Sequence, residues 1–248
     1  MASTPIDSIS ALPWRVTFRV LQCLSIRDLS ELRLTSRHWR QCVIRYGSAW
    51  ISVTITNRSA QLINMLPRIA LFIEHLTLDT YSENIEEGVM VMMMNGEFKN
   101  LRSLEDGEYL LLGLERVENT LVKLIIQGER VPMIQDVLHR ASKLTHLPYS
   151  STFDNIGIIY PGILFDGELP DVLPLTHLQL KVPDYKDIEY PELELLLQHT
   201  PNLRYLKLSR IWGIQLVENL VSKYCPSIEL FAVEPFEDPD LTGFDIWH

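Results

Sequence analysis

After its first fifty residues, the chain repeats a short pattern of hydrophobic positions. An apolar residue is followed three positions later by a second, which we call the central anchor, and two positions after that by a third. Consecutive anchors are on average about 25 residues apart, a period typical of proteins built from repeated structural units. Two weaker copies, around Leu104 and Leu147, lack the third apolar residue. The six full copies are Trp50/Val53/Ile55, Ile73/Leu76/Leu78, Leu121/Leu124/Ile126, Leu175/Leu178/Leu180, Leu203/Leu206/Leu208 and Ile228/Phe231/Val233.

Each copy predicts one short β-strand, because alternating apolar residues place one face of a strand in a core. Pro201 and Pro226 precede two of these strands, at points where a helix has to stop. A strand, a turn and a helix repeated about eight times predict an α/β solenoid with a parallel sheet inside and helices outside. The amphipathic stretches that predict helices include residues 60–66, 133–138, 193–197 and 216–221.

A conventional α/β domain with leucine-rich strands is the alternative fold. A doubly wound domain would need near-continuous apolar strands and usually a glycine-rich first turn, and the sequence has neither, so the solenoid is favoured. The longest interval between anchors includes a stretch rich in glycine and proline, residues 150–174. This stretch is interpreted either as an ordinary surface loop or as a lip over the concave face of the sheet.

The first fifty residues, called the head, have helical rather than repeat spacing. Apolar residues from Val16 to Leu24 make a stripe on a first helix that starts near Pro13. Asp28 and Glu31 fit the start of a second helix as cap and reciprocal partner. A third helix, capped by Thr35 or Ser36, carries Trp39, Cys42, Val43 and Tyr46. Three short helices are too few to bury all these side chains, so some are expected to contact another surface and others to form an internal core.

Charge divides the chain at the same place. The head holds seven arginines against three acidic side chains, a net of +4, so the other 198 residues carry −14 of the formal net charge of −10. An acidic body repels nucleic acid, so an acidic protein is the better partner for the basic head. We predict a three-helix domain at residues 1–48, a repeat domain of about eight units at 49–235 and an acidic tail at 236–248.

The head resembles the F-box family. Four motifs occur in the family's order and at matching spacing: Leu12-Pro13, Val20-Leu21, Asp28-Leu29 and Arg37-His38-Trp39. Two positions depart from the family pattern, since Arg15 replaces a usual acidic residue and Thr17 a common aliphatic one, which would weaken docking without abolishing it. The alternative is a capped helical triplet that serves only as the cap of the repeat domain.

The F-box resemblance implies binding to the Skp-family adaptor, which is acidic, and through it to a cullin. The residues that it implies as adaptor contacts are Leu12, Pro13, Val16, Val20, Leu21, Leu24, Leu29 and Trp39. The body resembles the leucine-rich repeats linked to some F-boxes, because its period falls within ~20–29 residues and its junctions at 201–203 and 225–228 are similar. Together these resemblances imply a small three-helix F-box followed by an irregular leucine-rich-repeat solenoid.

The implied function is that of the substrate-recognition subunit of an SCF-type ubiquitin ligase. Such a subunit is not an enzyme itself; it brings a client protein close to a ubiquitin-charged conjugating enzyme and raises the effective concentration of the two. The alternative is an adaptor-bound F-box and leucine-rich-repeat scaffold with a role outside ubiquitin ligation.

Alignment of the repeats predicts a cationic strip on the concave face. Arginine and lysine bind carboxylate and phosphate oxygens through charge-assisted hydrogen bonds, so the strip predicts a site for an acidic or phosphorylated client segment. Two other interpretations are ordinary solvated charges and an acidic tail, including Glu234, that folds back onto the strip. The predicted client-binding residues are His177, Lys181, Arg204, Tyr205 and Lys207, with Arg210 just beyond.

The sequence predicts neither catalysis, nor a cofactor, nor a metal site. It has no Gly-x-Ser-x-Gly, phosphate-loop or dinucleotide-binding motif, and its three cysteines are far apart. His75, His146 and His177 share one repeat position but come from different repeats, so we do not expect them to converge. Without a signal-peptide layout or an apolar run of ~18 residues, the chain is expected to be cytoplasmic or nuclear and not bound to a membrane.

Overall fold

The computed structural model of the chain describes most of the head and the repeat region. The described residues are 12–24, 26–57, 60–80, 82–106, 111–128, 134–151, 169, 172–181, 190–209 and 213–234. The predicted acidic tail, Arg210 and most of the 150–174 stretch lie outside them.

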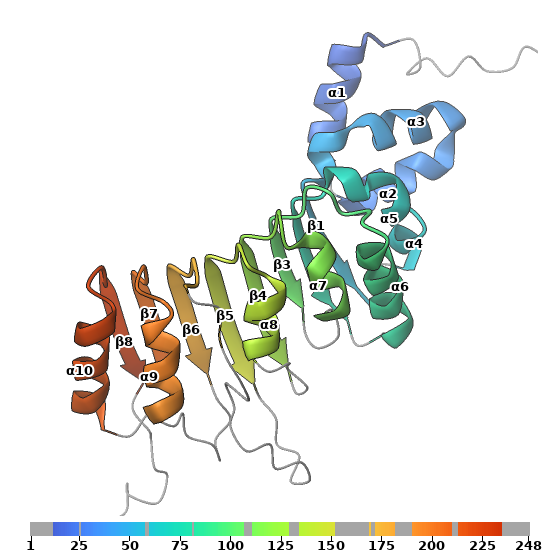
Figure 1. Cartoon of the computed structure of the whole chain (residues 1–248). Coiled ribbons are helices and arrows are strands. Elements are labelled where there is room, and N and C mark those ends of the chain that lie inside the picture. The colour runs from blue at the N-terminus through green and yellow to red at the C-terminus, as the bar shows by residue number, and fades with distance from the viewer. Residues whose placement is uncertain are drawn as a thin grey trace, which may run out of the picture.

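Three helices and a short 3-10 helix make up the described head (Figure 1). They are α1 (Trp14–Gln22), α2 (Ile26–Thr35), α3 (Arg37–Arg45) and η1 (Gly47–Trp50). Ser36 caps α3 as predicted, because its hydroxyl accepts the N–H of Trp39 at 3.2 Å. Asp28 is not the cap of α2, as the sequence had suggested. That helix starts at Ile26, which places the Asp28 carboxylate inside the first turn, where it still faces the positive end of the helix dipole.

Among the residues that the structure describes, eight strands form one parallel sheet whose order follows the sequence, β1 to β8. Their register pairs the predicted anchors of neighbouring strands, such as Val53 with Leu76 and Leu178 with Leu206. The mixed α/β fold with a parallel sheet is therefore confirmed. The strands are β1 (Ser52–Thr56), β2 (His75–Asp79), β3 (Ser103–Asp106), β4 (Lys123–Gly128), β5 (His146–Ser151), β6 (His177–Lys181), β7 (Tyr205–Ser209) and β8 (Leu230–Glu234).

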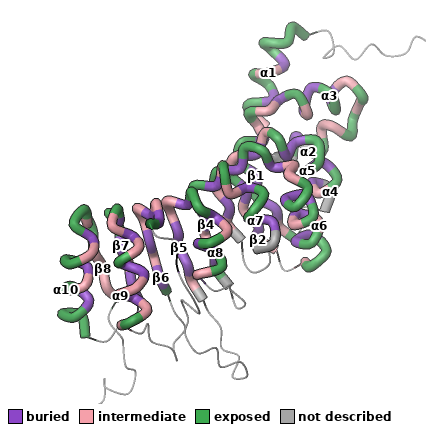
Figure 2. Tube along the Cα trace, in the orientation of Figure 1, coloured by how far each residue is buried: buried purple, intermediate pink, exposed green. Residues whose placement is uncertain are grey.

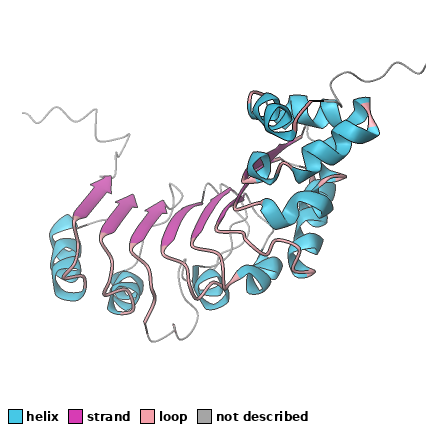
Figure 3. Cartoon of the chain, turned by 90° about the horizontal axis from the view of Figure 1, so that it is seen from above, coloured by secondary structure: helices cyan, strands magenta, loops and turns pink. Residues whose placement is uncertain are grey.

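The connections between strands contain helices that lie on one face of the curved sheet (Figure 3). These are α4 (Ala60–Ile63), α5 (Leu66–Ile69), η2 (Ala70–Phe72), α6 (Glu83–Met94), α7 (Leu111–Val117), α8 (Ile134–Arg140), α9 (Tyr190–Gln198) and α10 (Ile214–Tyr224). In the part of the chain that the structure describes, no helix is long and apolar enough to cross a bilayer.

Strand side chains alternate between the helix-covered core and the opposite side of the sheet, which we call the open face. The anchors from Val53 to Leu206 are buried, whereas Phe231 on the last strand is half-buried. The open face results from the same alternation, since residues one position before or after an anchor point away from the core. Its first row, paired strand to strand, is Ser52, His75, Ser103, Lys123, His146, His177, Tyr205 and Leu230.

A continuous core joins the head to the sheet. Trp50 is fully buried, and its indole Nε1–H donates to the Val43 carbonyl of α3 at 3.0 Å. Gly47 lies so close to Phe72 of η2 that an added Cβ would overlap the ring. The predicted burial of Trp50 at this junction is confirmed, but Trp50 belongs to η1 rather than to the first strand. The chain turns through η1 before β1 begins, and this turn places the Trp50 indole against α3.

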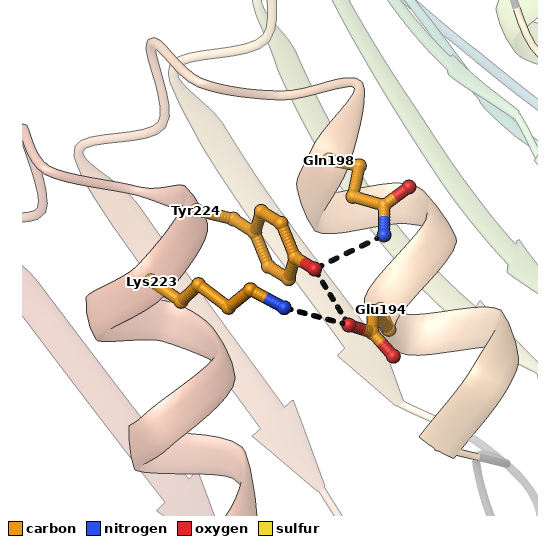
Figure 4. Close-up of polar contacts among 4 residues, drawn as sticks. All are labelled: Glu194, Gln198, Lys223 and Tyr224. Carbon is orange, nitrogen blue, oxygen red and sulfur yellow. Dashed lines mark hydrogen bonds and ion pairs between the residues drawn. The ribbon is translucent and has the colours of Figure 1, made fainter.

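A polar cluster links the last two helices on the outer side of the sheet (Figure 4). The Tyr224 hydroxyl donates to Glu194 Oε1 at 2.6 Å, and Lys223 Nζ donates to the same oxygen at 3.3 Å. Gln198 Nε2 donates to the Tyr224 hydroxyl at 3.2 Å. The hydrogen bond from Tyr224, followed by that from Lys223, holds the pKa of Glu194 below its usual value. The cluster therefore joins α9 and α10 on the outer side of the sheet.

Candidate protein-interaction surfaces

Helix α1 is exposed along most of its length (Figure 2), and three of its exposed residues, Trp14, Val16 and Val20, are large and apolar. Val16 and Val20 are four residues apart on α1, so they share one side of the helix, and Leu12 lies just before the helix begins; all three are exposed. Val16 retains 44 % of its surface. Trp14 is 49 % exposed and lies near Phe18, with ring centroids 5.9 Å apart. An exposed stripe of this kind on a folded domain is typical of a protein contact surface.

The structure divides the predicted adaptor contacts into two groups. Leu12, Pro13, Val16 and Val20 are exposed, and Leu24 is half-buried. The remaining three, Leu21, Leu29 and Trp39, are buried in the core of this chain itself. Side chains with 0 to 5 % exposure stabilise the head and cannot contact a partner in this conformation. Sequence reasoning missed Trp14, although a tryptophan directly after the Leu-Pro pair was a visible signal.

The basic character of the head is displayed on its surface. Arg15 and Arg19 of α1 are exposed, as are Arg37, Arg40 and Arg45 of α3. The cations of α1 therefore lie on the same helix as the apolar stripe. Apolar side chains bordered by arginines suit a partner that combines apolar and acidic surface.

The predicted cationic strip is largely paired within the sheet. The register places His177 beside Tyr205 on the neighbouring strand, as expected. Arg204 Nη1 lies 3.5 Å from Glu229 Oε1, and Lys207 Nζ lies 2.5 Å from Glu234 Oε1. The hydrogen bond from Lys207 lowers the pKa of Glu234. Acidic groups of β8 and its preceding turn thus neutralise two of the five predicted client-binding residues.

Two of the three aligned histidines converge, contrary to the sequence-based expectation. The rings of His146 and His177 stack with centroids 4.1 Å apart and an interplanar angle of 13°. Tyr205 continues the stack at 5.5 Å and 14°. His75 lies in the same row, but strands β3 and β4 separate it from His146. The prediction failed because it counted repeats along the chain, whereas β5 and β6 are hydrogen-bonded neighbours that pair His146 with His177, 31 positions later.

The middle of the open face is cationic. Strands β4 to β7 carry Lys123, Lys181, Lys207 and two histidines at their open-face positions, and no acidic residue. Burial, the neighbouring His177 and the charge of Lys123 hold the pKa of His146 below its usual value. Sequence reasoning did not assign Lys123 or His146 to this site. The repeated Thr-His-Leu tripeptide at 145–147 and 176–178 was the signal available for it.

Metal binding has no support in the described ranges. Among those residues, no group of three or more histidine, cysteine, aspartate and glutamate side chains is placed to hold a metal ion. The stacked histidines supply only two imidazoles, on parallel rings.

Comparison with known proteins gives a result for the head alone. None of the curated proteins compared with the chain matches it. Residues 9–47 match the F-box domain, a range that includes α1, α2 and α3. F-box domains generally bind Skp-family adaptors, and F-box proteins are generally non-catalytic. The head of this chain is therefore an F-box domain, which indicates an adaptor-binding role.

Proposed function

We propose that this chain is the substrate-recognition subunit of an SCF-type ubiquitin ligase. The observation that carries the proposal is the F-box domain at residues 9–47 together with the exposed apolar stripe on its first helix. On this proposal, residues 1–48 dock onto the Skp-family adaptor and through it onto a cullin. Residues 49–235 act as a leucine-rich-repeat solenoid that presents the open face to a client protein, and residues 236–248 form an acidic tail.

Adaptor binding is assigned to the exposed residues of α1. Val16 and Val20 supply apolar contact area on the helix, and Trp14 at its first position and Leu12 just before it extend this area. A few large apolar side chains at the centre of an interface usually carry most of its binding energy. Arg15 and Arg19 would steer the acidic adaptor toward this helix.

Client binding is assigned to the open face because its exposed side chains are not needed for the core. The F-box head and the sheet share one hydrophobic core through Trp50, so a client on the sheet would be held in a defined position relative to the adaptor. A fixed position is what a non-catalytic receptor contributes, since it raises the effective concentration of client at the ubiquitin-charged enzyme.

A pair of matched substitutions tests the adaptor contact. Val16→Asp places a charge in the exposed stripe, and Val91→Asp places one at an equally exposed valine on α6, since the two are 44 % and 45 % exposed. We expect Val16→Asp to abolish co-purification with the adaptor and Val91→Asp to leave it unchanged. Circular dichroism should show both variants folded. Equal binding by both variants would exclude α1 as the contact.

Ubiquitin ligation needs its own measurement. The chain purified with adaptor, cullin and RING protein should capture a client and support its ubiquitination in a reconstituted reaction. A complex that contains the adaptor but never a cullin would favour the scaffold role outside ubiquitin ligation.

A further inference from the structure

The two ends of the parallel sheet are covered to different extents (Figure 1). At β1, the sheet shares its core with the head, and the core-facing residues Val53 and Ile55 are buried. At β8, the residues in the same positions are Phe231 and Val233, and both are only half-buried. Within the described residues, no strand pairs with the far side of β8. The core of the sheet is therefore partly open at this end.

Ile228 extends this opening to the residues just before β8. It occupies the first apolar position of the repeated pattern and is half-buried, whereas the residue at that position is buried in every preceding unit. In a stack of repeated units each one covers its neighbour, so the outermost unit needs another cover for its apolar side. We call Ile228, Phe231 and Val233 the apolar end. The buried equivalents of Ile228 are Trp50, Ile73, Leu101, Leu121, Leu144, Leu175 and Leu203.

The far edge of β8 also presents main-chain groups. Leu230 N–H donates to a main-chain carbonyl directly before β7 at 3.0 Å. Successive N–H groups of a strand point to opposite edges, so those of Phe231 and Val233 point away from β7. Natural proteins protect such an edge with proline, with charge or with a covering segment. β8 contains no proline, and its one charged residue, Glu234, is paired with Lys207 of β7. A covering segment is the device that remains.

The chain continues from β8 into a segment whose composition suits a cover. Residues 235–248 follow directly on Glu234 and lie outside the described residues. Phe244 and Ile246 alternate with Asp245, which is the pattern of a strand with one apolar face. Five residues of the segment are large and apolar, namely Phe236, Leu241, Phe244, Ile246 and Trp247.

The segment is long enough to turn back along β8. An extended chain spans about 3.3–3.6 Å per residue, so the stretch from Glu234 to Phe244 reaches about 30 Å. The strand β8 itself is about 17 Å long. Attachment at the end of β8 also gives the segment an effective concentration at this edge in the millimolar range. This favours the segment over a second copy of the chain or a separate client strand.

We propose that residues 236–247 cover the apolar end, with Phe244 and Ile246 packed beside Phe231 and Val233 and the main chain of the segment paired with the far edge of β8. The segment then completes the core of the last unit, as the head completes the core of the first. This inference does not rest on the proposed function. It gives the tail a role that its apolar residues perform, in place of the acidic role that its charge suggests.

The ion pairs of the sheet argue against the alternative in which the tail binds the cationic strip. Lys207 is already paired with Glu234, and Arg204 is paired with Glu229. A further carboxylate from the tail would gain little from two neutralised cations, since exposed ion pairs are weak. Burial of the half-exposed apolar end, in contrast, is favourable without any unpaired cation.

Two matched variants of the full chain separate these accounts. Phe244→Ser/Ile246→Ser removes apolar side chains without a change of charge, and Glu237→Gln/Asp238→Asn/Asp240→Asn removes charge without a change of apolar surface. We expect the serine variant to lower the melting temperature by about 5 °C or more, and the amide variant to leave it near that of the parent. Far-ultraviolet circular dichroism should show both variants folded. Equal melting temperatures for the serine variant and the parent, or a larger loss in the amide variant, would overturn the proposal.

Hydrogen exchange in the parent chain tests the cover without any substitution. The N–H groups of Phe231 and Val233 should be protected from exchange, as those of Leu206 and Leu208 in the paired strand β7 are expected to be. Deletion of residues 236–248 should speed exchange at Phe231 and Val233 at least tenfold and leave β4 unchanged. Fast exchange at these two positions in the parent, or protection that survives the deletion, would contradict the proposal. Protection that appears only at concentrations where the parent sediments as a dimer would assign the cover to a second copy instead.

Discussion

Replacing Trp50 by alanine should destabilise the whole chain, because this side chain joins the F-box head to the sheet. Trp50 is fully buried, and its indole N–H is bonded to the Val43 carbonyl. Truncation of a buried tryptophan costs about 3–5 kcal/mol. The carbonyl keeps a second donor, the N–H of Tyr46 at 3.2 Å, so the lost hydrogen bond adds about 1 kcal/mol or less.

The expected loss is measurable by two methods. In a chain of 248 residues, each kcal/mol shifts the melting temperature by roughly 2–4 °C, so Trp50→Ala should lower Tm by about 6–24 °C. Urea unfolding followed by circular dichroism should show a lower midpoint with an unchanged slope. Trp50→Phe keeps most of the apolar contact and loses only the N–H, and should fall between the parent and the alanine variant.

A matched control tests whether the loss of stability comes from the buried position of Trp50 rather than from removing a tryptophan side chain in general. Trp14 is 49 % exposed, so Trp14→Ala should change the free energy of unfolding by about 0.5 kcal/mol or less. The reasoning is refuted if Trp50→Ala changes stability no more than Trp14→Ala does. A lower midpoint for the head alone, with the sheet transition unchanged, would mean that the two parts do not share one cooperative core.

Three further predictions follow from local geometry. Gly213→Ala should destabilise the chain more than Gly96→Ala. Both glycines have positive φ, 69° and 70°, which costs alanine about 1–2 kcal/mol, but only Gly213 also faces a tyrosine hydroxyl that a Cβ would overlap. Equal urea midpoints for the two variants would contradict this prediction. Tyr224→Phe should lower the free energy of unfolding at pH 7 and have little effect in acid. The pKa of Glu194 is depressed in the folded chain, so its hydrogen bond from Tyr224 adds stability above the unfolded pKa, and this stability disappears as the pH falls below about 4. Urea midpoints at pH 7 and pH 3 check this. Cys225 should resist alkylation at pH 8 until the chain unfolds, because burial raises the pKa of its thiol to about 11 and covers the sulfur. Alkylation of Cys225 in the folded chain at the same rate as the exposed Cys23 would be inconsistent with the structure.

Much of the architecture could be predicted from the spacing of apolar residues. A strand packed on one face must alternate apolar and polar positions, so the eight anchors from 53 to 231 identified all eight strands, including the two weak copies. The F-box motif was equally local, because the ordered Leu-Pro, Asp-Leu and Arg-x-Trp elements lie within forty residues. Helix boundaries were less predictable: α2 begins at Ile26 rather than after Asp28, since several polar residues can start a helix.

The contact surface of the head depended on tertiary structure. Val20 and Leu21 are adjacent in sequence and equally apolar, yet Val20 is exposed and Leu21 is buried. A broad apolar stripe on a helix holds more residues than one contact can cover. The packing of the neighbouring helices therefore decides which of these residues are buried in the core and which stay exposed. The same applies to Leu29 and Trp39, which sequence reasoning placed in the adaptor contact and the structure places inside.

By itself, the sequence determined which residues form strands, which segment forms the F-box and that the head is basic, because each of these follows from local periodicity, motif spacing or composition. Only the tertiary structure decided which side chains meet across strands. The stack of His146 on His177 and the pairing of Lys207 with Glu234 join residues 27 to 31 positions apart. Such contacts depend on the conformations of side chains on neighbouring strands, which the periodicity of each strand does not specify.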